Sequence, residues 1–228
     1  MGVRLGFSSR IIGPKHCWHS NLLASFHFRV ECHEFNYSHE PRSGLDFVNL
    51  RAGQYADASP LYLNWLPPSR SVLLPKIKPS VSESKIACAF RDELGEAMAT
   101  LLVKGLTAYL SIRPQTEKNI ILFTGPTAQS PVEWVDAIDR GRGTSIPIEY
   151  LHGQHWIVEC AKHGEGGKPR AWFEARLVWM QGVSDGDAAT VDPALETVLR
   201  RRPETGTEAV ERLVRADPEY RWNQNHFR

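Results

Sequence analysis

The 228-residue sequence has few cysteines, almost no net charge and no long apolar run. Its four cysteines are scattered and form no C-x-x-C pair, which argues against a disulfide scaffold or a paired-cysteine metal site. No segment reaches the roughly 18 to 20 apolar residues that a membrane-spanning helix requires. The N-terminus also lacks the apolar stretch of a secretory signal. These absences predict a soluble protein, and we expect a cytoplasmic location.

The glycine-rich loops of nucleotide-binding proteins are also missing. Gly125 to Val132 lies between an apolar segment and a helical pattern, which is the order that cradles phosphates at a helix N-terminus. However, Ser130 stands where the second glycine of that motif belongs, and Pro131 stands where its lysine belongs. The capped start of a helix explains Ser130 without any ligand. We therefore expect no nucleotide cofactor and name no other cofactor.

The clearest pattern that is present is the alternation of residues 26–35. Apolar Phe26, Phe28, Val30 and Cys32 alternate with polar His27, Arg29, Glu31 and His33. Because successive side chains of a strand point to opposite faces, this pattern predicts a half-buried antiparallel strand. Histidine can transfer a proton near neutral pH, and arginine binds phosphates or carboxylates. His27, Arg29 and His33 are therefore candidate catalytic residues.

A second alternating pattern covers residues 155–161 and 171–180, with the glycine-rich run 163–169 between them. It predicts an antiparallel β-hairpin with Trp156 and Trp179 on its core side. The outer face then brings Glu159 close to Arg176 and adds His155 to the candidate catalytic residues. Exposed cross-strand pairs of opposite charge would produce the same pattern without a function.

Possible metal ligands occur in the same region, at His152, His155, Cys160 and His163. Zinc needs donors that converge on one point. On a regular strand Cys160 and His155 point to opposite faces. We therefore expect no metal site.

Several helix starts can be read from capping signals. Ser80 to Glu83 has the spacing of a capping box, and the following apolar residues recur at helical intervals, which predicts a helix over about 81–104. Ser130 to Glu133 predicts a shorter helix over about 131–139. Asp192 and the segment Thr205 to Glu208 predict two short helices near the C-terminus.

The order of these elements predicts an α+β fold with a largely antiparallel sheet. We expect a single domain over residues 1–188, which is β-rich over 1–79 and mixed over 80–188. Residues 189–228 then form a helical C-terminal extension and tail.

The tail gives the main indication of function. Aromatic residues and arginines alternate in it, at Tyr220, Arg221, Trp222, Phe227 and Arg228. This composition is common at protein interfaces and at stacking sites for single-stranded nucleic acid. A tail docked on its own domain would have the same composition.

No complete catalytic set is recognisable in the sequence. We therefore expect a non-enzymatic binding or assembly subunit, which contacts a protein or nucleic acid through a polar sheet face and the tail. The alternative is a hydrolase or metal-independent nuclease that uses the strand-borne histidines and arginine. We expect no membrane partner.

Overall fold

The computed structural model describes residues 4–9, 47–63, 65, 69–105, 112, 120–162 and 168–219. Strands β1 (Arg4–Ser9), β2 (Phe47–Ala52) and β4 (Ile120–Phe123) form one sheet in the order β1-β2-β4. Strands β3 (Val72–Lys76) and β5 (Ile148–His152) form a second sheet. Every pairing between these described strands is parallel. The prediction of a largely antiparallel sheet is therefore wrong.

The positions of three strands were nevertheless readable from the sequence. Apolar segments predict strands near 45–50, 119–124 and 146–151, and β2, β4 and β5 lie there. An apolar run marks where a strand lies, but it says nothing about the direction of the neighbouring strand. That direction depends on the connections, because parallel neighbours need a crossover of a dozen residues or more.

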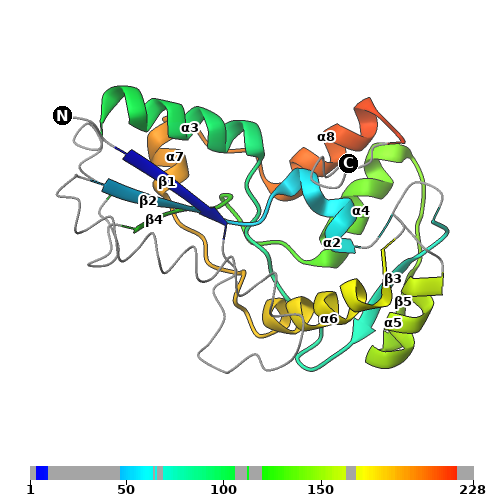
Figure 1. The fold of residues 1–228 in the computed structure, drawn as a ribbon. Helices are drawn as coiled ribbons and strands as arrows, with labels where there is room; N and C mark the ends of the chain where they lie inside the picture. The colour runs from blue at the N-terminus through cyan, green and yellow to red at the C-terminus, as the bar shows by residue number, and fades with distance from the viewer. Residues whose placement is uncertain are drawn as a thin grey trace.

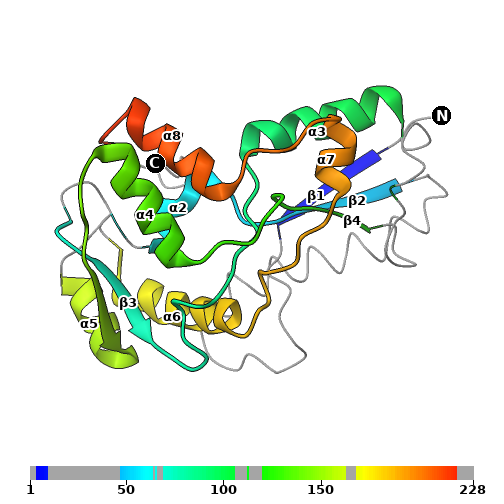
Figure 2. The same ribbon diagram turned by 180° about the vertical axis from the view of Figure 1, so that it is seen from behind.

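One face of the three-stranded sheet is covered by two helices, α3 (Arg91–Lys104) and α7 (Ala194–Leu199) (Figures 1 and 2). The core between these layers is apolar, and Leu50 and Phe123 of the sheet are buried with Leu94 and Leu195 of the helices. Burying a side chain of this size contributes roughly 1.5 to 3 kcal/mol. This packing holds the sheet whose strand ends form part of the candidate site.

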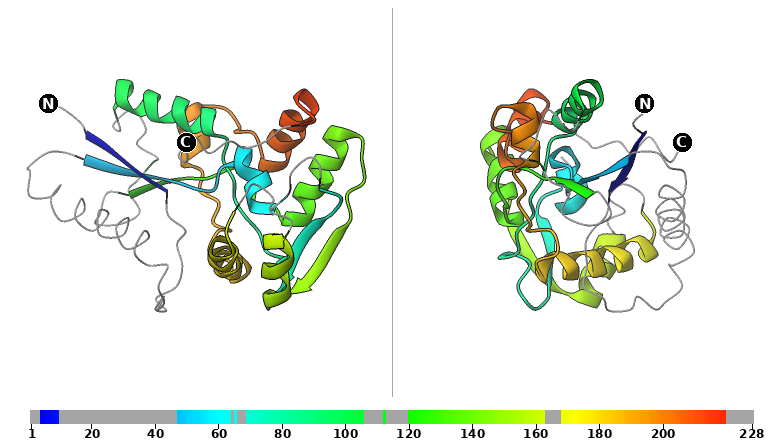
Figure 3. Two further views of the ribbon diagram at one scale, coloured as in Figure 1. Left: turned by 45° about the vertical axis from the view of Figure 1, so that its right-hand side comes forward. Right: turned by 90° about the vertical axis from the view of Figure 1, so that its left-hand side faces the viewer.

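The remaining α-helices lie with the β3-β5 pair on the other side of the molecule (Figure 3). They are α2 (Ser59–Leu63), α4 (Pro131–Arg142), α5 (Gly153–Lys162), α6 (Arg170–Ser184) and α8 (Gly206–Ala216). Their core contains three fully buried tryptophans, Trp65, Trp134 and Trp156. None of the helices in the described part of the chain is long and apolar enough to cross a membrane.

The β-hairpin predicted over residues 155–180 is wrong, because its two arms are the helices α5 and α6. The buried side chains of α6 lie at Phe173, Arg176, Met180 and Val183, a spacing of three to four residues. Some of these positions would also lie on one face of a strand, so the apolar pattern in the sequence did not distinguish the two structures. Trp156 is buried as expected, but in a helix.

The long helix begins ten residues later than predicted, at Arg91 instead of residue 81, and it ends as expected at Gly105. The backbone before it pairs with other segments. The N–H of Ile86 donates to Gln129 at 2.9 Å, and that of Ala87 donates to Ala188 at 2.9 Å. Because these groups bond to distant residues, they are not available for a helix.

Two of the three predicted capping boxes are confirmed. The one at Ser80 does not form, because residues 81–83 are a turn in which the N–H of Glu83 donates to the backbone carbonyl of Ser80. The Ser130 hydroxyl accepts from the N–H of Glu133 at the start of α4, and the Thr205 hydroxyl accepts from the N–H of Glu208 at the start of α8. Each glutamate side chain bonds back to the N-cap residue. Asp192 accepts from the N–H of Ala194 at the start of α7. These local signals were readable because each pairs residues that are close in sequence.

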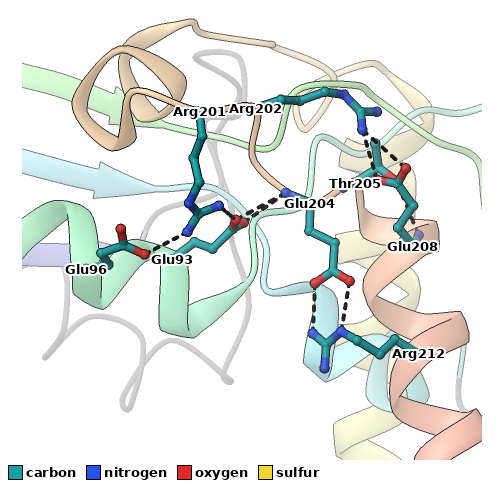
Figure 4. Close-up of polar contacts among 8 residues, drawn as sticks. All are labelled: Glu93, Glu96, Arg201, Arg202, Glu204, Thr205, Glu208 and Arg212. Atoms are coloured by element: carbon teal, nitrogen blue, oxygen red, sulfur yellow. Dashed lines mark hydrogen bonds and ion pairs between the residues drawn. The ribbon is translucent and has the colours of Figure 1, made fainter.

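A network of charged groups and one threonine joins α3 to α8 through the segment that precedes α8 (Figure 4). Its members are Glu93, Glu96, Arg201, Arg202, Glu204, Thr205, Glu208 and Arg212. Arg201 bonds both Glu93 and Glu96, and Arg212 binds the two oxygens of Glu204 at 2.9 and 2.7 Å. Glu93 also accepts the backbone N–H of Glu204. The arginine-rich segment 200–202 therefore contributes to internal ion pairs.

Gly125 provides a direct test of the close backbone contact that organises the fold. A Cβ atom on Gly125 would lie 1.8 Å from the carbonyl oxygen of Cys88. We expect Gly125→Ala to lower the free energy of unfolding by at least about 2 to 3 kcal/mol, because the backbone must move to admit the methyl group. Urea denaturation measures this loss.

Gly95 is the matched control, since it is an exposed glycine inside α3 and a Cβ atom there would have nothing within 4 Å. Gly95→Ala should raise the stability by about 0.5 to 1 kcal/mol, because alanine favours a helix interior. Equal stability of the two variants would contradict the contact at Gly125.

The capping box of α8 predicts a pH dependence of stability. The backbone N–H of Thr205 lowers the pKa of Glu208, with further contributions from the Thr205 hydroxyl and Arg202. A carboxyl group whose pKa is lowered by folding stabilises the protein above its unfolded pKa of about 4.3, and this contribution is lost as the pH falls through the folded value. Glu208→Ala should therefore be less stable than wild type at pH 7. The gap in urea midpoint should close in acid, and a constant gap would contradict the prediction.

Candidate functional site

The carboxyl ends of parallel strands are the usual ligand-binding edge of a sheet. Here the ends of β2 and β4 are followed by Gly53 and Gly125. Both glycines lie against the backbone of residues 87 and 88. A Cβ atom on Gly53 would lie 2.8 Å from the carbonyl oxygen of Ala87. The N–H of Ala89 donates to Gln54 at 2.9 Å, beside Gly53. These two turns are therefore closed by the backbone of residues 86–90 and do not form a phosphate-binding cradle.

The segment after β2 continues into the short helix η2 (Ala56–Ala58) and then α2. It brings a buried carboxylate, Asp57, against the guanidinium of Arg91 at the start of α3. Burial raises the pKa of Asp57, and Arg91 opposes that rise. The Arg91 guanidinium also lies 6.0 Å from the ring centre of Tyr55. This ion pair links the segment after β2 to α3.

Tyr62 of α2 is the next functional group along this segment. Its hydroxyl oxygen accepts the backbone N–H of Tyr55 at 3.2 Å. Burial raises the pKa of Tyr62, so the phenol is neutral at physiological pH. Its ring stacks on Trp179 of α6, with 5.3 Å between ring centres and 18° between ring planes. Tyr62 therefore joins the strand end to α6.

Arg176 of α6 is only 8% exposed, although it is charged. Its guanidinium carbon lies 3.7 Å from the ring centre of Trp179, 5.3 Å from that of Tyr62 and 5.9 Å from that of Trp172. Burial lowers the pKa of Arg176 to about 9, so it stays protonated at neutral pH. We call Tyr62, Trp172, Arg176 and Trp179 the arginine–aromatic cluster. It combines apolar ring surface with one buried positive charge.

The residues proposed from the sequence have different outcomes. His155 is exposed on α5, not on a strand, while Trp156 beside it and Cys160 are buried. Glu159 bonds Lys162 of the same helix at 2.6 Å, and no ion pair between it and Arg176 occurs among the described residues. The predicted polar sheet face therefore does not form here.

The other proposed residues, His27, Arg29, His33 and the tail residues Tyr220, Arg221, Trp222, Phe227 and Arg228, lie outside the described residues. The predicted strand over 26–35 also lies outside them. Their roles stay predictions.

Sequence reasoning missed the arginine–aromatic cluster. It assigned residues 171–180 to a strand, which puts Trp172 and Arg176 on one face and Trp179 on the other. In a helix, Trp172, Arg176 and Trp179 are spaced by four and three residues and share one face. The helical spacing of these residues was the signal that could have found the cluster, but the contact with Tyr62 required the tertiary fold.

Comparison with known proteins gives a consistent result. No family model matches the chain. The sequence is 28% identical over 182 residues to an NmrA-like family domain-containing oxidoreductase of Aspergillus flavus, an alignment that covers 80% of this chain and 54% of that protein. The chain thus spans about half the length of this curated relative.

Two solved structures are similar in fold. A nucleoside-diphosphate-sugar epimerase of Staphylococcus aureus matches 92% of this chain and 64% of its own, with 12% identity and a TM-score of 0.58. An NADPH-dependent quinone oxidoreductase of Escherichia coli, solved with NADPH, matches 84% of this chain and 59% of its own, with 17% identity and a TM-score of 0.56.

These similarities correct three expectations from the sequence. The non-enzymatic binding or assembly subunit and its hydrolase or nuclease alternative are wrong, because the similar proteins are oxidoreductases and an epimerase. The protein or nucleic-acid partner has no support from them. The expectation of no nucleotide cofactor also conflicts with them, since a structural neighbour binds NADPH. The parallel strands and their covering helices have the Rossmann-type fold of these structural neighbours.

Proposed function

We propose that this chain is part of an NmrA-like, NAD(P)(H)-dependent oxidoreductase, in which its described residues form the side that holds the organic substrate. The observation that carries the proposal is the course of the chain after β2. From the ligand-binding edge of the parallel sheet it runs directly into α2, whose Tyr62 belongs to the arginine–aromatic cluster. The similarity to an NmrA-like oxidoreductase supports the same proposal.

The dinucleotide phosphates do not fit the turns that the structure describes. A dinucleotide-binding sheet uses a G-x-G-x-x-G turn, whose glycines let the backbone approach the pyrophosphate. The sequence contains no such motif. In the described turns at Gly53 and Gly125, the carbonyl oxygens of Ala87 and Cys88 occupy the space that an approaching phosphate would need. Because the described turns leave no room for the phosphates, we assign the described residues to the substrate side of the enzyme.

The groups near the strand end have defined tasks in this proposal. The Asp57–Arg91 pair and the bond from Tyr55 to Tyr62 hold the segment after β2 in place. The rings of Tyr62, Trp172 and Trp179 provide apolar surface for an organic molecule. The neutral Tyr62 hydroxyl stays protonated, because burial raises its pKa.

Binding of the two halves of the cofactor tests this proposal. Reduced nicotinamide mononucleotide carries the reactive ring of NADPH without the adenosine half, whereas 2′,5′-ADP carries the adenosine half alone. With the purified 228-residue protein, we expect NADPH and the mononucleotide to bind with dissociation constants within about tenfold of each other. We expect no saturable binding of 2′,5′-ADP. The fluorescence of the reduced nicotinamide reports the first two titrations, and calorimetry reports the third.

Two other results would each contradict part of the proposal. Absence of saturable binding for both NADPH and the mononucleotide would contradict a role in an NAD(P)(H)-dependent oxidoreductase. Binding of 2′,5′-ADP with most of the affinity of NADPH would show that this chain holds the phosphates, and would contradict the assignment to the substrate side.

A further inference from the structure

Arg176 is a buried charge without a compensating anion in the described structure. Its Nε and Nη2 atoms are shielded from solvent and have no hydrogen-bond partner. Among the described residues, no carboxylate pairs with it, and the Tyr62 hydroxyl is the group that partly offsets the effect of burial on its pKa. Buried arginines without a partner are costly, so such a residue indicates a partner that is absent from the described residues.

The two atoms without partners define the shape of that missing partner. Nε and Nη2 form one edge of the planar guanidinium, and their N–H groups point in the same direction. This fork matches the two oxygens of a carboxylate, and such bidentate pairs are the strong form of charged hydrogen bond. The Trp179 ring lies 3.7 Å from the guanidinium carbon and stacks against the group. Because the ring covers a face of the guanidinium, the edge formed by Nε and Nη2 is the side on which we expect the anion.

The surroundings define the rest of the ligand. The rings of Tyr62, Trp172 and Trp179 all lie within 6 Å of the guanidinium carbon. Flat aromatic side chains pack well against a second flat ring, and offset stacking contributes roughly 0.5 to 1.5 kcal/mol beyond the buried area. A ligand that places a carboxylate at Arg176 would therefore bring a conjugated or aromatic body against these rings.

We infer that Arg176 binds the carboxylate of an aromatic carboxylic acid, which lies in the arginine–aromatic cluster as the substrate of the proposed oxidoreductase. Only the statement that this acid is the substrate rests on the proposed function. A monovalent carboxylate neutralises the single guanidinium charge. A phosphate dianion would leave a net negative charge in the same buried environment, which is unfavourable.

The test uses trans-cinnamate as the probe, with the purified protein and without any cofactor, so that its result is independent of the NADPH experiment. We expect saturable binding of cinnamate by calorimetry and a rise of Tm by a few degrees at saturating concentration, because a ligand of the folded state stabilises it. Cinnamamide is the same size but neutral, and phenyl phosphate carries the dianion. Both should bind at least about tenfold more weakly than cinnamate.

Variants of Arg176 connect this binding to the guanidinium fork. Arg176→Met should weaken cinnamate binding at least about thirtyfold, since truncating one partner of a buried charge pair costs that much or more. Arg176→Lys keeps the charge but lacks the fork, and we expect a loss of about tenfold. It serves as the second variant if the methionine variant does not fold. Arg170→Met is the matched control, because Arg170 is an exposed residue of the same helix that pairs with Glu174 at 2.9 Å.

The outcomes separate cleanly. Unchanged affinity in Arg170→Met with weakened binding in both Arg176 variants supports the inference. Equal binding of cinnamate and cinnamamide, or a lysine variant that binds as tightly as wild type, would exclude recognition by the fork. No cinnamate binding by the wild-type protein at millimolar concentration would overturn the inference and leave the NADPH result unaffected. Tighter binding of phenyl phosphate than of cinnamate would contradict a carboxylate ligand and indicate a phosphate ligand instead.

Discussion

The backbone pairing of residues 86–90 with the turns after β2 and β4 is the contact on which the rest of the structure depends. Ala89 donates to Gln54 and accepts from Ala56, while Ile86 and Gln129 bond each other in both directions. Strands β2 and β4 belong to one sheet, and Gln129 precedes α4 of the other layer. One short segment therefore connects the strand ends to the helices around β3 and β5.

This pairing also explains features that otherwise look unrelated. It requires glycine at positions 53 and 125, since a side chain would meet the carbonyl oxygens of Ala87 and Cys88. It delays the start of α3 to Arg91, because the preceding backbone groups already have partners. It also closes two turns at the edge where a dinucleotide-binding sheet would admit phosphates. The same contact thus supports the fold and restricts what the described residues can bind.

The charged groups divide into two kinds that have different physical roles. Arginines of the network between α3 and α8 pair with carboxylates, and an exposed pair such as Arg201–Glu96 or Arg202–Glu208 contributes about 0 to 1 kcal/mol. Arg176 is instead buried among aromatic rings and lacks a carboxylate among the described residues. A buried charge of this kind lowers the stability of the fold unless a bound ligand supplies the opposite charge. The contrast is the reason to connect Arg176, and not the arginine-rich segment 200–202, with binding.

The sequence by itself determined the local features of this protein. The capping boxes at Ser130 and Thr205, the stop at Gly105 and the positions of β2, β4 and β5 follow from residues near one another in the chain. Such signals act over one turn of helix or along one strand, so no distant contact is needed to read them.

The tertiary structure alone decided the strand direction, the helical state of residues 153–162 and 170–184, and the site. Alternating residues such as those of 171–180 fit one face of a strand and, in part, one face of a helix, so burial on the core decided between them. The parallel sheet depends on crossover connections, which a strand pattern does not encode. Arg176 meets Tyr62 across more than a hundred residues of sequence, because α2 and α6 pack together only in the folded chain. A site built from such long-range contacts is invisible to a pattern of neighbouring residues.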